Sequence, residues 1–180
     1  MADAQVPVIV VTGPIGAGKT TITRAIGDVL ADARIPHTLV DMDWLRDSFP
    51  APAGDRFNSR LGHRNLADLA RNSRAAGSER FVIADVVESR ADRENYQWAI
   101  PGAVVTVVRL AVDPEENRRR IAYRAAGNDD PWEVERAAEL VGIMEANDVA
   151  DVVIDTTSRS PGAVARDILS RIGWVSSNDQ

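Results

Sequence analysis

Eight consecutive residues near the start of the chain have the types and spacing of a phosphate-binding loop. Gly13-Pro-Ile-Gly-Ala-Gly-Lys-Thr20 matches the pattern G-x-x-x-x-G-K-[ST] at every fixed position. In this pattern backbone N–H groups curl around phosphates, the lysine reaches the β- and γ-phosphates, and the last hydroxyl can bind Mg²⁺. The motif predicts a nucleotide site made of Gly13, Pro14, Ile15, Gly16, Ala17, Gly18, Lys19, Thr20 and Thr21.

A glycine-rich turn that binds nothing is the alternative interpretation of these residues. The surrounding sequence favours the phosphate site, because the motif follows an apolar β-branched run and opens a stretch with helical periodicity. The chain also has 21 basic residues, of which Lys19 is the only lysine. A chain that otherwise uses arginine therefore has a lysine where the motif requires one.

Two acids follow the next apolar run, which ends at Val40. Asp41 and Asp43 are one residue apart, so on extended backbone their side chains point in similar directions. Near a γ-phosphate, one can accept the proton of an attacking hydroxyl and the other can bind substrate or Mg²⁺. We favour Asp43 as the base because it is further from the strand. The alternative is that Asp43 caps a helix starting at Trp44.

A third acid, Asp85, ends the apolar run 80–84. This is the position at which a second Mg²⁺ ligand, beside Thr20, is expected in a nucleotide-binding α/β protein. The alternative is an acid that caps a loop.

Arginines on the predicted helix 114–126 are candidates for contacts with the nucleotide and the transferred group. Arg120 and Arg124 are four residues apart and share a helix face, so they can offset the charge that develops during phosphoryl transfer. A solvated face paired with nearby glutamates is the alternative, and we prefer it for Arg118 and Arg119.

A polar cluster beyond the paired acids is the predicted acceptor site. Arg46, Arg56 and Arg60, with Glu88 from a later loop, suggest an anionic or polyhydroxylic acceptor. Each arginine taken alone is equally well explained as an ordinary surface residue. Trp44 lies next to the acids and can form a wall of the same site.

These residues need a scaffold that brings the ends of several strands together. Short apolar runs predict strands at residues 7–11, 37–40, 80–85, 103–110 and 151–155. Helical periodicity predicts helices at residues 20–33, 58–76, 92–99, 114–126, 132–147 and 160–172. Their alternation predicts an α/β fold, a doubly wound, mostly parallel five-stranded sheet with helices on both faces. Ligands then bind beyond the carboxyl ends of the strands.

Composition excludes several classes of protein. The 180 residues suit one domain, residues 1–175, with a polar tail at 176–180. The absence of cysteine excludes disulfides and thiolate metal sites, and a net charge of −6 disfavours general nucleic-acid binding. No apolar run could span a membrane and no secretory signal is evident, so we expect a cytoplasmic protein.

The residues after the second strand resemble those of adenylylsulfate kinases, a group of small P-loop phosphotransferases. Asp41-Met-Asp43-Trp-Leu-Arg46 resembles their D-G-D-N-x-R stretch. Asp55-Arg56 with Asn58 and Arg60 resembles their substrate-binding D-R-x-x-N segment, and Asn128-Asp-Asp-Pro-Trp132 is similar to their D-D-P-Y element. The resemblance extends from Val8 to about Ile172 and implies a P-loop kinase fold.

Chloramphenicol phosphotransferases are a second group that the chain resembles. Asp43-Trp-Leu45 through Pro50 resembles their D-S-L-x-x-x-x-P stretch, and Ala84-Asp85-Val86 resembles their D-D-V. Asp155-Thr-Thr157 is also similar, which implies that Thr157 borders the adenine. In that family the acid matching Asp43 is the base for a substrate hydroxyl.

Together these observations predict an ATP- and Mg²⁺-dependent kinase that phosphorylates a hydroxyl of a small molecule. The expected partners are a nucleotide and that acceptor, without nucleic acid or membrane, and a homodimer is an open alternative. A nucleotide-binding regulatory protein and an NTP hydrolase without an acceptor are the competing functions.

Overall fold

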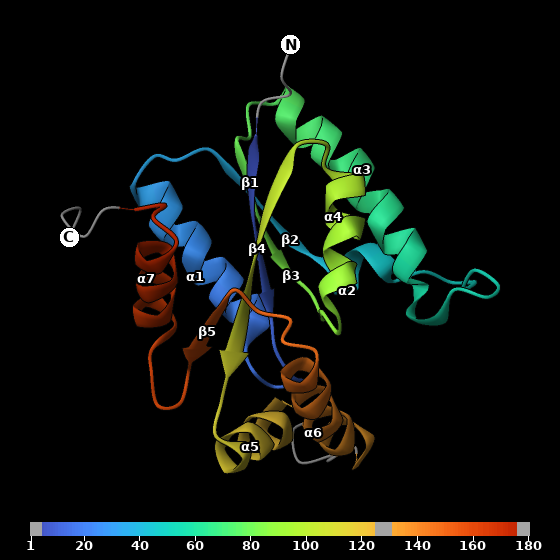
Figure 1. Cartoon of the computed structure of the whole chain (residues 1–180), viewed down its shortest axis with the longest axis vertical. Helices are drawn as coiled ribbons and strands as arrows, with labels where there is room; N and C mark the ends of the chain where they lie inside the picture. The colour runs from blue at the N-terminus through green and yellow to red at the C-terminus, as the bar shows by residue number, and fades with distance from the viewer. Residues whose placement is uncertain (1–4, 125–130, 176–180) are drawn as a thin grey trace.

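The computed structural model describes residues 5–124 and 131–175. Its centre is a five-stranded sheet in the order β2-β3-β1-β4-β5, with all neighbouring strands parallel (Figure 1). The strands are β1 Val6–Thr12, β2 His37–Asp41, β3 Arg80–Ala84, β4 Ala103–Ala111 and β5 Val152–Asp155. The predicted doubly wound parallel sheet is confirmed.

Helices and two short 3₁₀ turns connect the strands. The α-helices are α1 Lys19–Asp32, α2 Met42–Arg46, α3 Ser59–Ala75, α4 Arg93–Ala99, α5 Pro114–Arg124, α6 Pro131–Ala146 and α7 Pro161–Arg171. The 3₁₀ turns are η1 Arg56–Asn58 and η2 Arg90–Asp92. Helices α1 and α7 lie on one side of the sheet, and α3 and α4 lie on the other (Figure 1).

The central strand supplies both halves of the core. Val8 and Val10 of β1 pack against residues of α3, α4 and α6, whereas Ile9 and Val11 pack against α1 and α7. All four side chains have no exposed surface. A strand buried on both faces needs a continuous apolar sequence, which explains why the run 7–11 contains no polar residue.

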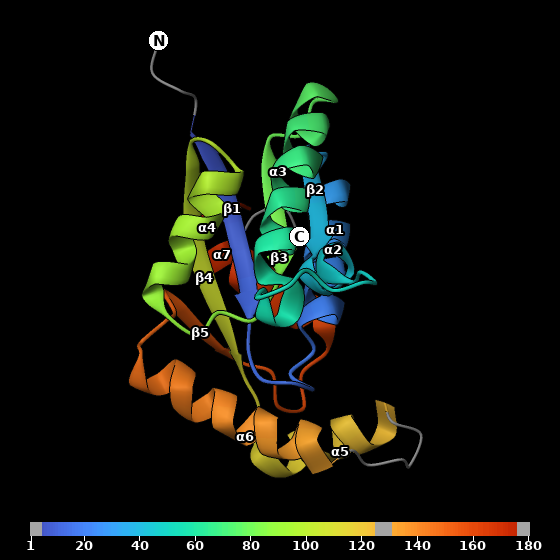
Figure 2. The ribbon, with the colours of Figure 1, turned by 90° about the vertical axis from the view of Figure 1, so that its right-hand side faces the viewer.

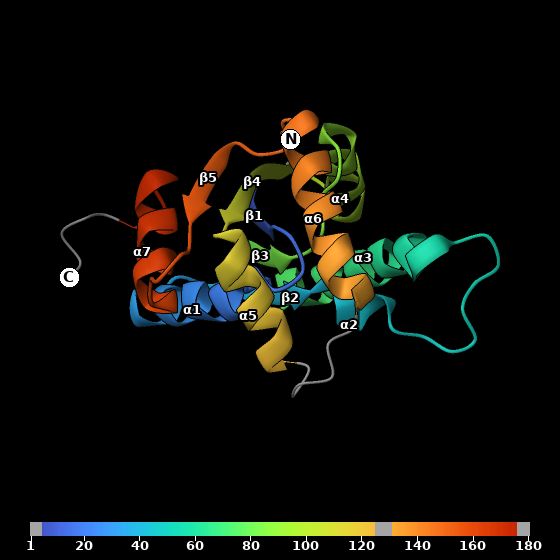
Figure 3. The ribbon, with the colours of Figure 1, turned by 90° about the horizontal axis from the view of Figure 1, so that it is seen from below.

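The carboxyl ends of the strands all lie at one edge of the sheet. Helices α5 and α6 run across this edge, below the ends of β1 and β4, as Figures 2 and 3 show from two directions. The phosphate-binding loop leaves β1 at the same edge and leads into α1. The loops that follow the strands therefore meet at the edge of the sheet that α5 and α6 run across.

Most predicted elements differ from the observed ones by one or two residues at their ends. Helix α2 is the main addition, and it corrects one alternative. The side chain of Asp41, not of Asp43, caps this helix by accepting a hydrogen bond from the N–H of Asp43, and the helix begins at Met42 rather than Trp44. The predicted tail, 176–180, lies outside the described residues. In the part of the chain that is described, no helix combines the length and apolar character needed to cross a membrane.

Candidate active site

The phosphate-binding loop connects β1 to the first turn of α1. Gly16 and Gly18 have backbone φ angles of +83° and +92°, values that residues with a Cβ rarely adopt. Lys19 begins α1 and folds back over the loop, where its Nζ donates to the carbonyls of Gly13 at 3.1 Å and Pro14 at 3.2 Å. This curled backbone at a helix N-terminus is the arrangement that receives phosphate groups.

The two acids after β2 have different surroundings. The Asp41 carboxylate accepts from the Thr20 hydroxyl at 2.6 Å and from the N–H of Asp43 at 3.1 Å. Asp43 lies on the first turn of α2, and its side chain is 80% exposed. Asp41 is thus fixed between the phosphate loop and α2, whereas Asp43 is presented to the space in front of the loop.

Arg46 links Asp43 to the buried acid at the end of β3. Its guanidinium forms an ion pair with Asp85 and lies 3.8 Å from Asp43 Oδ1, measured from Nε. Nε also donates to the carbonyl of Met42 at 3.0 Å, one helical turn earlier. The arginine is held from several sides and fixes the spacing between the two carboxylates.

Asp85 already has several hydrogen-bond donors. Besides Arg46, its carboxylate accepts from the Tyr96 hydroxyl at 2.7 Å and from the N–H of Val86 at 2.7 Å. Burial raises the pKa of Tyr96 well above its ordinary value, and the neighbouring Asp85 charge adds to this effect, so the phenol stays protonated and donates. These contacts make Asp85 a support for Arg46.

Arg120 of α5 joins the phosphate loop to the loop after β5. Its guanidinium donates to the hydroxyl of Thr156 at 3.2 Å, to the carbonyl of Thr156 at 3.0 Å and to the carbonyl of Ala17 at 3.5 Å. It also forms an ion pair with Glu116. The predicted arginine therefore reaches the nucleotide side of the site.

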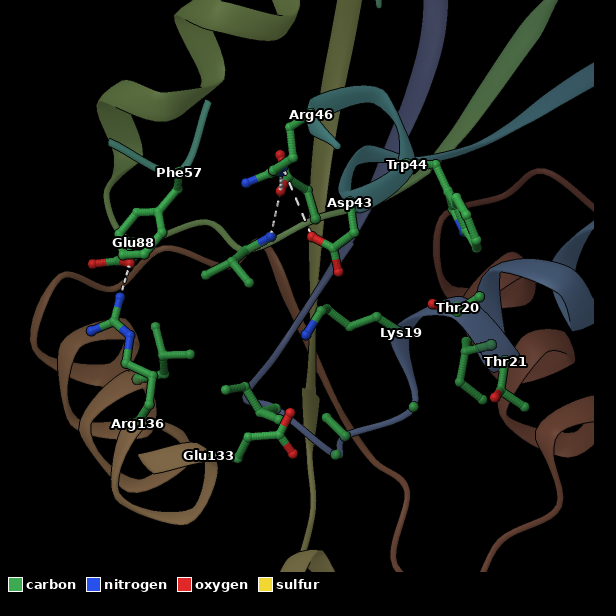
Figure 4. Close-up of a pocket in the computed structure, with 18 of the residues that line it drawn as sticks. Lys19, Thr20, Thr21, Asp43, Trp44, Arg46, Phe57, Glu88, Glu133 and Arg136 are labelled. Atoms are coloured by element: carbon green, nitrogen blue, oxygen red, sulfur yellow. Dashed lines mark hydrogen bonds and ion pairs between the residues drawn. The ribbon is translucent and has the colours of Figure 1, made fainter. Parts of the chain in front are cut away.

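A cavity of about 1260 Å³ lies where these elements meet. Figure 4 shows Asp43 and Lys19 pointing into it, with Glu88 and Arg136 on the other side of the view. The predicted site residues that line it are Ile15, Gly16, Ala17, Gly18, Lys19, Thr20, Thr21, Asp43, Arg46, Asp85, Glu88 and Arg120. Trp44, which was expected to form a wall, also lines it and is 73% exposed.

Other predicted residues lie elsewhere. Arg60 does not line the cavity; its guanidinium donates to the Gly54 carbonyl at 3.0 Å. Thr157 is also outside, because its hydroxyl accepts from the N–H of Asp113 at 3.0 Å. The side chains of Arg56 and Arg124, and the Asn128–Asp130 part of the predicted D-D-P element, fall outside the described residues.

Several cavity-lining residues were missed by the sequence analysis. Thr156 lines the cavity, whereas the predicted residue, Thr157, does not. The strand ends at Asp155, and Thr156 is the first residue of the loop that follows. Arg159 follows in the same loop and donates to the Asp155 carbonyl at 3.1 Å. Arg136 and Phe57 also line the cavity. The position of Arg159 after a strand could have indicated it, whereas helix periodicity alone does not point Arg136 toward the site.

The donor set fits a Mg²⁺ ion that arrives with a nucleotide. Among the described residues, no group of three or more His, Cys, Asp or Glu side chains is arranged to hold a metal ion. Mg²⁺ usually needs only one or two protein oxygens because phosphate oxygens and water complete its shell. Thr20 and Asp41, joined at 2.6 Å, supply oxygens of this kind beside the phosphate loop.

Comparison with known proteins assigns the chain to a family. A family model described as an AAA domain matches residues 9–141. A shikimate kinase from Shewanella oneidensis is 30% identical over 178 residues, covering 92% of this chain and 96% of that protein. A shikimate kinase from Alteromonas mediterranea is 28% identical over 174 residues, with 92% and 96% covered.

Solved structures agree with the fold. A gluconokinase from Sinorhizobium meliloti 1021 superposes with a TM-score of 0.62 at 21% identity and covers 97% of both chains. The relatives are kinases of shikimate type, so the predicted resemblance to adenylylsulfate kinase and chloramphenicol phosphotransferase is correct only at the level of small P-loop kinases. The chain belongs to the AAA domain family and is a P-loop phosphotransferase related to the shikimate kinases over nearly its whole length.

Proposed function

We propose that this protein is an ATP- and Mg²⁺-dependent kinase that transfers the γ-phosphoryl group to a hydroxyl of a small molecule. The observation that carries the proposal is that Lys19 and Asp43 line the same cavity and both point into it (Figure 4). A site for simple nucleotide binding does not need an exposed carboxylate facing the phosphate loop. The shikimate kinases among the relatives support transfer to an alcohol group.

The loop and its neighbours would hold the donor. Backbone N–H groups of the loop, Lys19 and Arg120 surround the place where a triphosphate fits a helix N-terminus. Thr156, whose hydroxyl accepts from Arg120 at 3.2 Å, borders the same side. We assign Arg120 to binding the nucleotide and to offsetting charge that develops on the transferred group.

Thr20 and Asp41 are the residues that we assign to Mg²⁺. These two residues would hold the ion, which would supply positive charge to offset the negative charge of the nucleotide phosphates. Asp41 accepts the Thr20 hydroxyl hydrogen bond and can accept others from water around the ion. Asp85, the ligand expected from the sequence, is less suited because Arg46, Tyr96 and Val86 already donate to it.

Asp43 is assigned as the general base. Its exposed carboxylate accepts the proton of the acceptor hydroxyl as that oxygen forms its bond to phosphorus and the bond between phosphorus and the leaving ADP oxygen breaks. Arg46, held by Asp85 and lying 3.8 Å from Asp43, is a positioning residue for this carboxylate.

The Asp43→Asn substitution tests the function. Removing a general base reduces phosphoryl transfer by about 10²–10⁴-fold, because the amide cannot accept the proton. Acceptor-dependent ADP release with Mg²⁺ and ATP measures this, while ATP affinity from calorimetry stays within about twofold because Asp43 is not part of the phosphate loop. Asp68→Asn is the matched control, since Asp68 lies exposed on α3 and, among the described residues, forms an ion pair with Arg71 alone.

Two results would contradict the proposal. ADP release that proceeds at the same rate without any acceptor indicates an NTP hydrolase. ATP binding without turnover across hydroxyl-bearing acceptors indicates a nucleotide-binding regulatory protein.

A further inference from the structure

The part of the cavity away from the phosphate loop is rich in carboxylates. We call the acceptor side the lining contributed by α2, residues 47–63, the β3–α4 region and α6. Among its described side chains, five carboxylates stand against two guanidinium groups: Asp43, Asp47, Asp85, Glu88 and Asp92 against Arg46 and Arg136. These described side chains carry a formal surplus of three negative charges.

Both arginines on this side are already matched by two acids each. Arg46 contacts Asp85 and lies near Asp43, as described above. Arg136 forms an ion pair with Glu88 and another with Glu139, whose Oε2 lies 2.8 Å from Nη1. The hydrogen bond to Glu139 is the main cause that raises the pKa of Arg136, and the charge of Glu88 adds to it.

An anionic acceptor would meet an unfavourable field here. An anion that contacts either guanidinium lies beside a carboxylate that the arginine already holds, Asp85 beside Arg46 or Glu88 beside Arg136. Like charges brought together across a binding site disfavour association. The two arginines therefore hold carboxylates of the acceptor side in place, and their positive charge is already offset by those carboxylates.

The same side presents groups suited to hydroxyls, ammonium groups and apolar ring faces. Carboxylates accept hydrogen bonds from hydroxyl and ammonium donors, and Asn58 and Asn95 add amide groups. Two aromatic residues of the lining, Phe57 and Trp132, are 52% and 54% exposed. Aromatic faces attract cations and cover the apolar faces of ring-shaped ligands.

We propose that the acceptor is a polyhydroxylated molecule that is uncharged or carries an amine, and that carboxylated and phosphorylated acceptors are disfavoured. This inference rests on the proposed kinase function and specifies its substrate class. It also separates this chain from its shikimate kinase relatives, whose name states an acid as substrate.

Two matched series of acceptors test the charge preference. Gluconate, glucitol and glucamine differ only at one carbon, which carries a carboxylate, a hydroxyl or an ammonium group. Shikimate, inositol and 2-deoxystreptamine form a cyclic series with the same order of charge. We expect acceptor-dependent ADP release with kcat/KM at least ~10-fold higher for the uncharged or amine-bearing member than for the acid.

A charge-removing variant tests the cause. Glu88→Gln removes one negative charge and releases Arg136 from one of its partners, so kcat/KM for gluconate should rise by about 10-fold relative to glucitol. Glu135→Gln is the matched control, because Glu135 lies exposed on the same helix, α6, and does not line the cavity. This control should leave the ratio unchanged.

The possible outcomes separate the two proposals. Wild-type protein that prefers gluconate or shikimate over its matched neutral and amine partners overturns the inference but leaves the kinase function intact. An unchanged gluconate-to-glucitol ratio in Glu88→Gln also counts against the inference. ATP binding without acceptor-dependent ADP release from any of the six compounds counts against the kinase function and, with it, the inference.

Discussion

At the scale of single residues, the paired acids have different surroundings although they are only two residues apart. Asp41 accepts from the Thr20 hydroxyl and from the N–H that begins α2. Asp43, two residues later, is turned outward by the first turn of that helix and is 80% exposed. The sequence favoured Asp43 as the base because it lies further from the strand, but it did not show the hydrogen bond that holds Asp41 to Thr20.

Tyr96→Phe tests the support beneath Arg46. The Tyr96 side chain is 1% exposed, and its hydroxyl donates to Asp85 at 2.7 Å, so the substitution leaves a buried carboxylate oxygen without this donor. We expect the free energy of unfolding to fall by about 1–3 kcal/mol, measured by urea denaturation.

The other tyrosine is the control for that experiment. Tyr123 is 91% exposed, so Tyr123→Phe should change the free energy of unfolding by less than about 0.5 kcal/mol. Equal effects of the two substitutions would show that the bond between Tyr96 and Asp85 does not stabilise the fold.

At the scale of elements, the contact between α5 and the phosphate loop limits which residues the loop can contain. A Cβ added to Gly16 would lie 2.6 Å from Asn117 Oδ1 and 2.7 Å from Ile121 Cγ1, both on α5. Gly18 has a similar φ, +92° against +83°, but a Cβ there would meet nothing within 4 Å. Substitution of Gly18 would therefore introduce backbone strain alone, whereas substitution of Gly16 would add a steric clash.

Gly16→Ala and Gly18→Ala form a matched pair on this basis. Each forces a residue with a Cβ into left-handed backbone, which costs about 1–2 kcal/mol. Gly16→Ala must also displace the side chains of Asn117 and Ile121 on α5, so its total loss of unfolding free energy should exceed that of Gly18→Ala by at least about 1 kcal/mol. Thermal or urea denaturation without nucleotide measures both losses. Equal losses would mean that α5 yields freely.

The elements also show what could be predicted from the sequence. The β1 strand and the loop after it were predictable because a doubly buried strand needs an unbroken apolar run and the loop needs fixed glycines. Helix α2 entered only as an alternative, a helix starting at Trp44, since five residues are too few to show helical periodicity. Arg136 was missed for a different reason. Periodicity predicts its helix, but it does not show that this helix runs across the carboxyl ends of the strands, where Arg136 lines the cavity.

At the scale of the whole molecule, a carboxylate on α7 makes the free energy of unfolding depend on pH. Asp167 of α7 accepts from Arg171 Nε at 2.7 Å and from Arg159 Nη1 at 3.0 Å. The hydrogen bond from Arg171 is the largest cause that lowers the pKa of Asp167 below its ordinary 3.8, and the bond from Arg159 adds to it. The ionised side chain therefore stabilises the fold at every pH above 3.8, and this contribution is lost as the pH falls through the lower folded pKa.

Asp167→Asn removes this contribution. Because the pair is partly exposed, we expect a loss of about 0.5–1 kcal/mol in unfolding free energy at pH 7. The difference from wild type should narrow as urea denaturation is repeated from pH 7 down to pH 3. Asp68→Asn is the control, with little effect throughout. A difference of constant size down to pH 3 would contradict the assignment.

The single lysine of the chain allows selective chemical modification of the phosphate loop. Lys19 is the only side-chain amine in a sequence with 21 basic residues, and it lies where the nucleotide is proposed to bind. An amine-reactive acyl reagent would therefore modify one side chain, and a lysine-specific protease has one bond to cleave, between Lys19 and Thr20. Peptide mass spectrometry, which separates acylated Lys19 from an acylated α-amine, would then report nucleotide occupancy without an engineered probe.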